Sequence, residues 1–197
     1  MIGRIAGRLL SKQPPLLLVD VGGVGYEIEA PMSTFYKLPA SGEPVVLLTH
    51  LTVREDAHLL FGFATVTERE LFRALIKVSG VGPKLALSVL SGVSVEDFWV
   101  TVRAGDVARL TKLPGVGRKT AERLIVEMRD RAGAEADAVL AGGLTAALAG
   151  SPLQEARSAL AALGYKPAEI QRFSEAVYKD GMTTEQIIQE ALKRAVR

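Results

Sequence analysis

The sequence has 197 residues, a net charge of +2 and a hydrophobic fraction of 48%, enough for one large packed domain or two to three small ones. It contains no cysteine, which excludes disulfides, thiolate catalysis and cysteine-ligated metal sites, and its two histidines are too few to indicate a metal centre. Basic residues interrupt the first apolar runs, and no run approaches the roughly 18 residues of a membrane span, so we expect a cytoplasmic protein without membrane contact.

Residues 1–64 are predicted to form a small closed β-barrel. Short apolar runs, such as LLLVDV at 16–21 and PVVLLTHLTV at 44–53, are separated by turns that contain glycine or proline. About five strands in a segment of this length are typical of a small barrel. In VGGVGY, Gly22, Gly23 and Gly25 are expected to supply positive φ angles to a tight hairpin. A dinucleotide-binding loop is not expected, because the glycine spacing does not match and no helix is predicted to follow.

Residues 65–131 are predicted to form a compact all-helical domain. Thr67 and Glu70 have the spacing of a capping box, and Ser94 is placed as the N-cap of a further helix. This segment holds 12 basic and 8 acidic side chains, a net charge of +4, whereas the segments on either side each have a net charge of −1. The positive excess is a weak indication of a polyanionic partner.

The last third of the chain is predicted to contain a linker and a small helical domain. Residues 132–150 are mostly alanine and glycine and are expected to form a flexible linker. Residues 151–197 are expected to form a three-helix bundle, marginal in size but able to fold. Ser151-Pro152 begins its first helix, Gly164 ends that helix, and Thr183 with Gln186 caps its last one.

One pattern occurs twice in the helical segment, as VSGVGPKLA at 78–86 and as LPGVGRKTA at 113–121, 35 residues apart. Each copy is an apolar-Gly-apolar-Gly turn between two predicted helices, which is typical of a helix–hairpin–helix unit. Glycine N–H groups approach an anion closely, and the following helix offers its unpaired N–H groups to the same anion. A plain connection between packed helices is the alternative for a single copy. The predicted phosphate-binding residues are Gly80, Gly82, Lys84, Gly115, Gly117, Arg118, Lys119 and Arg123.

The second copy has two other interpretations. A nucleotide-binding P-loop is excluded, because Arg118 stands where that motif needs glycine and because a helix is predicted before the turn. LPGVGRKTA also resembles the hairpin of endonuclease-III-like DNA glycosylases, in which the lysine that matches Lys119 attacks the sugar. The catalytic aspartate segment and cluster cysteines of those enzymes are absent here, and 67 residues leave little scaffold for a base pocket. A glycosylase or lyase that uses Lys119 remains the enzymatic alternative.

Two neighbouring acidic residues, Glu55 and Asp56, are predicted at the tip of a β-hairpin in THLTVREDAHLLFGF. Charged residues are common on solvated turns, which is the simplest interpretation of this pair. Carboxylates also repel DNA phosphates, so an acidic tip would suit a protein that keeps duplexes apart at one point while it holds them elsewhere. An adaptor that only docks helical partners is a third alternative for the whole chain.

Taken as a whole, the chain resembles the RuvA family, the four-way-junction-binding subunits of bacterial RuvA–RuvB branch-migration complexes. The resemblance rests on MIGRIAGRLL, VREDAHLLFGF, both hairpins, the Ala/Gly segment and ALAALGYKPAEI. It implies a multidomain α+β fold: an N-terminal OB-fold β-barrel, a central helical domain with two helix–hairpin–helix motifs, and a C-terminal three-helix bundle. It further implies sequence-independent binding of Holliday junctions in homologous recombination, DNA repair and the SOS response, without catalysis or a cofactor.

The resemblance also implies roles for residues and partners. Glu55 and Asp56 match the acidic pin of the family, which stands near the point where strands exchange. The implied assembly is a homotetramer, singly or as two tetramers face to face, which acts with the hexameric ATPase RuvB and with the junction resolvase RuvC. ATP is used by RuvB and not by this chain. The predicted RuvB-binding residues, for each of which packing in the bundle core is the alternative, are Leu160, Leu163, Tyr165 and Leu192.

Overall fold

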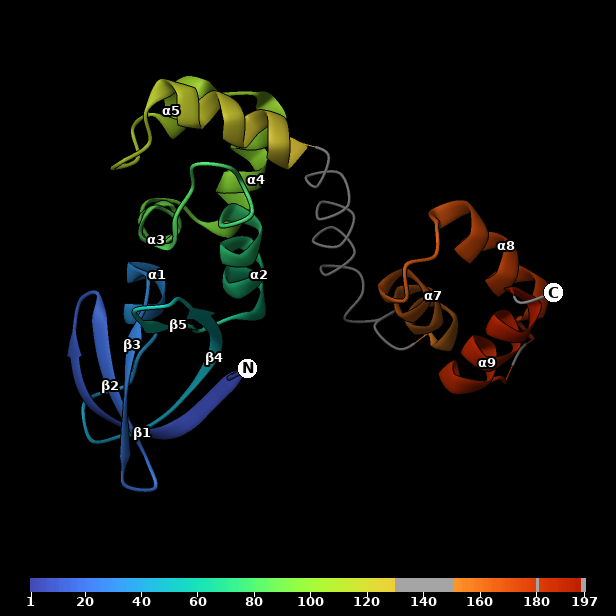
Figure 1. Cartoon of the computed structure of the whole chain (residues 1–197), viewed down its shortest axis with the longest axis horizontal. Helices are drawn as coiled ribbons and strands as arrows, with labels where there is room; N and C mark the ends of the chain where they lie inside the picture. Colours follow the sequence, from blue (N-terminus) through green and yellow to red (C-terminus); the bar gives the residue numbers. More distant parts are fainter. Residues whose placement is uncertain (130–150, 180, 196–197) are drawn as a thin grey trace. The chain divides into compact units, whose positions relative to one another are not determined.

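The computed structural model describes residues 1–129, 151–179 and 181–195, which belong to two compact units. The first unit contains the barrel and the helices up to residue 129, and the second contains the helices from residue 151 onward (Figure 1). The predicted linker, residues 132–150, lies outside the described residues. The predicted α+β fold with two different kinds of helical domain is confirmed.

The N-terminal segment forms a closed, OB-like barrel with strand order β1-β2-β3-β5-β4. All neighbouring strands are antiparallel except β3 and β5, which meet in parallel at Glu29 and Phe61. The elements are β1 (Arg4–Gln13), β2 (Leu16–Val21), β3 (Val24–Glu29), the short helix α1 (Met32–Phe35), β4 (Pro44–Val53) and β5 (His58–Phe63).

Apolar side chains, which alternate with polar ones along the strands, fill the interior of the barrel. Leu17 and Val19 of β2 are fully buried, whereas their neighbours on the strand are more exposed. At the β2–β3 turn, Gly22 and Gly23 have φ angles of 63° and 92°, as predicted. The prediction for Gly25 is wrong, because two left-handed residues already reverse the chain and Gly25 pairs with Asp20 within β3.

The helical domain follows directly from β5. Its elements are α2 (Val66–Leu75), α3 (Pro83–Gly92), α4 (Val95–Ala104), α5 (Val107–Leu110) and a helix over residues 118–129. Ser94 caps α4, as predicted, and accepts a hydrogen bond from the N–H of Asp97.

The capping box of α2 lies two residues earlier than predicted. Thr65 is the N-cap and exchanges hydrogen bonds with Glu68, whereas the sequence pointed to Thr67 and Glu70. Both pairs have the same spacing, so tertiary contacts decide between them. The buried carboxylate of Glu68 also receives hydrogen bonds from the N–H of Ala64 at 3.1 Å and from Lys37 at 3.3 Å. Glu68 therefore ties the start of α2 to the end of the barrel.

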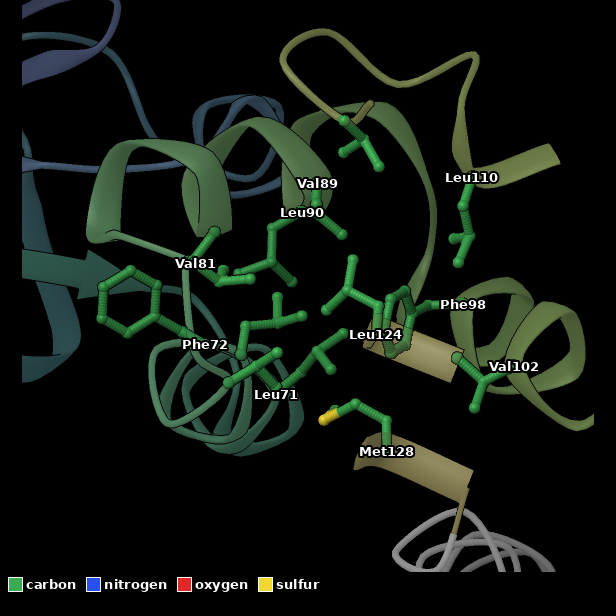
Figure 2. Close-up of a cluster of buried hydrophobic side chains, with 14 of the residues drawn as sticks. Leu71, Phe72, Val81, Val89, Leu90, Phe98, Val102, Leu110, Leu124 and Met128 are labelled. Atoms are coloured by element: carbon green, nitrogen blue, oxygen red, sulfur yellow. The ribbon is translucent and has the colours of Figure 1, made fainter. Parts of the chain in front are cut away.

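A shared hydrophobic core joins the barrel to the helical domain. The Phe72 ring of α2 lies 5.0 Å and 4.9 Å from the rings of Phe61 and Phe63, measured between centroids. Figure 2 shows side chains from several helices gathered in this core, including Leu124 and Met128 from the helix over residues 118–129. Every helix that flanks a glycine turn is thus fixed by burial of its apolar face.

The C-terminal unit is a bundle of α7 (Pro152–Ala162), α8 (Pro167–Val177) and α9 (Thr184–Ala195), which confirms the predicted fold of this segment. Ser151 is the N-cap of α7, and Gly164 follows this helix with a φ of 93°. Thr183 and Gln186 exchange hydrogen bonds of 3.0 and 3.4 Å before α9, also as predicted. The core of the bundle contains Leu160, Ile170, Phe173 and Ala191.

Candidate nucleic-acid interface

The two copies of the repeated pattern have the same backbone geometry. Gly80 and Gly115 both have a φ of 82°, a conformation that favours glycine. Val81 and Val116 are both 5% exposed, and each N–H donates to the carbonyl three residues earlier, at 3.0 and 3.1 Å. The buried valine anchors each turn in the core. The glycines on either side of it are exposed, so the sequence repeat is a structural repeat of two hairpins.

Each hairpin presents an open helix N-terminus. Gly82 is the N-cap of α3 and makes no side-chain capping bond, and Gly117 occupies the same position before the helix over residues 118–129. A Cβ added at either glycine would meet nothing within 4 Å. The first N–H groups of these helices have no intrahelical acceptor, and the helix dipole places partial positive charge beside them. Both sites have the chemistry of a phosphate contact.

The two hairpins differ by one backbone donor. Pro83 is the first residue of α3 and carries no N–H, whereas Arg118 stands at the matching position of the second hairpin and has one. Lys84 and Lys119 follow at matching positions and are both exposed. The second hairpin therefore offers one more N–H and one more basic side chain to an anion.

Sequence reasoning missed two lysines of the same surface. Lys77 and Lys112 stand one residue before the two copies, again 35 residues apart, and both are exposed. Extending the repeat by one residue toward the N-terminus would have found them. Each hairpin therefore carries an exposed lysine on either side of its turn.

Arg118 is paired with a carboxylate of its own helix. Its Nε donates to Oε1 of Glu122 at 2.9 Å, and its side chain is 84% exposed. Exposed ion pairs of this kind contribute little to stability, so a DNA phosphate can compete with Glu122 for the guanidinium. The carboxylate nevertheless lies one helical turn from the proposed phosphate site.

Glu122→Gln is expected to tighten DNA binding about twofold to fivefold at low salt, because it releases Arg118 and removes a charge that repels phosphate. The measurement is a fluorescence-anisotropy titration at several salt concentrations. Glu96→Gln, an exposed glutamate of α4, is the matched control for loss of one negative charge. Equal tightening in both variants would assign the effect to net charge and not to Arg118.

The structure places Arg123 differently from the other predicted phosphate-binding residues. Its Nη1 donates to the backbone carbonyl of Ser79 at 2.8 Å, in the turn of the first hairpin. This bond crosses between the two copies, since Arg123 belongs to the helix that follows the second one. The side chain is exposed but directed to a protein acceptor.

The acidic pair lies at the tip of the β4–β5 hairpin. The N–H of Arg54 donates to the carbonyl of Ala57 at 2.8 Å, which closes the turn around Glu55 and Asp56. Both carboxylates are exposed, and within the described part of the chain neither forms an ion pair. Both carboxylates therefore face solvent, next to the exposed Arg54 of the same turn.

The four apolar residues predicted to bind a partner have different environments in the bundle. Leu160 is 1% exposed and belongs to the core. Tyr165 and Leu192 are partly buried and pack against that core. Leu163, the C-cap of α7, is 60% exposed. Only Leu163 among the four is fully presented at the surface of this unit.

Two titratable groups near the helical domain have shifted pKa values. Hydrogen bonds from Ser94 and Arg109 hold the pKa of Asp97 below its usual value, and the Arg109–Asp97 pair at 2.9 Å links α5 to α4. Burial lowers the pKa of His50, and the nearby charges of Arg73 and Arg69 lower it further. Of these two groups, Asp97 thus holds α4 and α5 together, whereas His50 belongs to strand β4 of the barrel.

In the described residues, no group of three or more histidines and carboxylates lies close enough to hold a metal ion. None of the described helices is alone long and apolar enough to cross a membrane. Only α3 and α4 together reach that length, and they are bent by 98°.

An OB-like barrel followed by paired helix–hairpin–helix turns defines a multidomain protein of the nucleic-acid-binding class. Residues 1–62 match the family model described as RuvA N terminal domain, residues 72–130 match SAM-like Helix-hairpin-helix tandem, and residues 151–196 match RuvA, C-terminal domain. The chain belongs to the RuvA family.

Full-length relatives carry the name "Holliday junction branch migration complex subunit RuvA". The protein of Thioalkalivibrio sulfidiphilus is 58% identical over 201 residues, which cover 100% of both chains. That of Nitrosococcus oceani is 56% identical and covers 98% of this chain and 99% of its own, and that of Methylococcus capsulatus is 54% identical over 100% of both.

Proposed function

We propose that this chain is the non-catalytic subunit of a branch-migration complex and binds four-way DNA junctions independently of sequence. The observation that carries the proposal is the pair of hairpins with equal φ angles, buried valines and exposed lysines at matching positions. Backbone N–H groups and lysines grip phosphates and do not read bases. The names of the full-length relatives support the junction as the DNA structure that is recognised.

Two hairpins per chain suit a DNA that must move while it is held. Each hairpin contributes a few weak, exposed phosphate contacts, and such contacts can be exchanged as the duplex slides. The proposed contacts are made by Gly80, Gly82, Lys84, Gly115, Gly117, Arg118 and Lys119, with Lys77 and Lys112 beside them.

The acidic tip is proposed to act by repulsion. The two exposed carboxylates of Glu55 and Asp56 raise the free energy of any phosphate close to them. Placed where the arms of a junction meet, they would oppose stacking of the arms and favour strand separation. In this proposal the hairpins attract DNA phosphates and the acidic tip repels them.

We further propose the assembly and partners that the family resemblance implies. A homotetramer would match the four arms of the junction. A hexameric ATPase of the RuvB type would supply the motor activity, with ATP bound by the partner and no cofactor in this chain. Contact with that ATPase is proposed for the C-terminal bundle around the exposed Leu163, contact with a RuvC-type resolvase is proposed as well, and the location is proposed to be the cytoplasm.

A competition gel shift tests the function. Labelled four-way junction is bound by the full chain and then challenged with unlabelled junction or with linear duplex of the same sequence. We expect the junction to compete at concentrations at least tenfold lower, and binding to weaken steeply with salt. Equal competition by duplex would overturn junction recognition, and absence of salt-dependent DNA binding would favour the adaptor alternative.

The lyase alternative is tested separately. Borohydride reduction in the presence of DNA with an abasic site traps an imine if Lys119 attacks the sugar. We expect no covalent adduct, and a trapped adduct that disappears in Lys119→Met would overturn the non-catalytic assignment.

A further inference from the structure

The two hairpins are held by equivalent hydrogen bonds that cross from one copy to the other. Ser88 Oγ donates to the carbonyl of Pro114 at 2.7 Å, and Arg123 Nη1 donates to the carbonyl of Ser79 at 2.8 Å. Ser88 and Arg123 are 35 residues apart, as are the two acceptors, so these contacts occupy the same position in the repeat. Each turn is therefore held by a hydrogen bond from the helix that begins at the other turn. These two bonds, Ser88 to Pro114 and Arg123 to Ser79, are called the braces below.

The residues next to these two hydrogen bonds are closely packed against the other copy of the repeat. A Cβ added to Gly115 would lie 3.1 Å from Leu85, and one added to Gly80 would lie 3.2 Å from Nη1 of Arg123. One added to Gly92 would lie 2.7 Å from Leu113. The face of α3 that carries Leu85 and Gly92 thus lies directly against the second turn.

The braced carbonyls determine where the glycine amides point. In a trans peptide the C=O and the following N–H lie in one plane and point in opposite directions. Holding the Ser79 carbonyl against Arg123 turns the N–H of Gly80 away from that helix, and the bond from Ser88 does the same for the N–H of Gly115. These two amides belong to the glycines proposed to meet phosphate.

We propose that Ser88 and Arg123 are positioning residues, which orient the two glycine turns and couple them into one rigid grip. Arg123 acts through the Ser79 carbonyl and not as a phosphate ligand, just as the uncharged Ser88 acts through the Pro114 carbonyl. The inference rests on the proposed function, because the two turns are taken to bind DNA phosphates. It reassigns Arg123, which the sequence places among the phosphate-binding residues.

The test compares Ser88→Ala and Arg123→Met with Lys119→Met, which removes a basic side chain and leaves both braces intact. Junction affinity is measured over a series of salt concentrations, and amide hydrogen exchange is measured in the DNA-free chain. We expect both brace variants to bind the junction about threefold to tenfold more weakly at every salt concentration, with an unchanged salt slope. Lys119→Met is expected to reduce the slope by about one per lost contact.

Hydrogen exchange measures the effect of each variant on each turn separately. Arg123→Met is expected to accelerate exchange in residues 78–82, and Ser88→Ala in residues 113–117, because each loses its own brace. A slope for Arg123→Met as low as that of Lys119→Met, with unchanged exchange in residues 78–82, would make Arg123 a phosphate ligand and overturn the inference. Wild-type affinity in Ser88→Ala would overturn it as well. If the wild-type chain fails to bind DNA, the proposed function fails, while the exchange data still decide whether the braces orient the turns.

Discussion

Gly117→Ala is expected to weaken junction binding at least about tenfold while the folded chain stays as stable as before. An added Cβ at this position meets no protein atom within 4 Å, so the substitution costs nothing in packing. The same methyl group would occupy the space through which a phosphate approaches the helix N-terminus, and it would lengthen the N–H to phosphate contacts. Anisotropy titration measures the affinity, and thermal unfolding should give a Tm within about 2 °C of wild type.

Two related variants serve as controls. Gly115→Ala places a side chain at a φ of 82°, so it should lower both the affinity and the Tm. Gly82→Ala should resemble Gly117→Ala with a smaller effect, because Pro83 leaves the first hairpin with one fewer N–H to lose. Wild-type affinity in Gly117→Ala would show that no phosphate approaches this turn.

Neutralising the acidic tip is expected to separate binding from branch migration. Glu55→Gln combined with Asp56→Asn removes two exposed negative charges, so junction affinity should stay unchanged or rise up to about threefold. Branch migration driven by the partner ATPase should become several times slower, because the arms would lose the repulsion that we propose opposes their stacking. Gel shift measures the first quantity, and strand-exchange assays on a mobile junction measure the second.

The control for the tip keeps the same change in net charge. Glu27→Gln with Glu43→Gln removes two exposed carboxylates from elsewhere on the barrel and should leave branch migration at the wild-type rate. Weaker junction binding in the tip variant would contradict the repulsion argument. Slower migration in both double variants would assign the effect to total charge.

The parts of the site that depend on local geometry could be predicted from the sequence. Spacing of glycine and valine determines the turns, and the order of strand and turn residues places Glu55 and Asp56 at an exposed tip. The cross-repeat partners of Ser88 and Arg123 could not be predicted, because they join residues 26 and 44 positions apart. Nothing in a single helix shows which helix its polar side chain will face.

Two further differences between the sequence prediction and the structure also arise from tertiary packing. Leu160 and Leu163 are both apolar and three residues apart, yet only packing of the bundle makes one core and the other surface. Likewise, the two threonine–glutamate pairs at the start of α2 have equal spacing, and burial of Glu68 beside Lys37 selects the first. The spacing of such residues predicts a helix face or a helix cap, but it does not predict which side chains they contact in the folded chain.

Strand β5 lies between the acidic tip and the helical domain in the chain, with only a short connection on either side. It begins two residues after Asp56, and it ends three residues before α2, whose Phe72 packs on Phe61 and Phe63 of the strand. Six extended residues span about 20 Å, so the length of this strand sets the distance along the chain between the acidic tip and the start of the helical domain. A longer or shorter β5 would therefore shift the proposed point of repulsion relative to the proposed phosphate contacts.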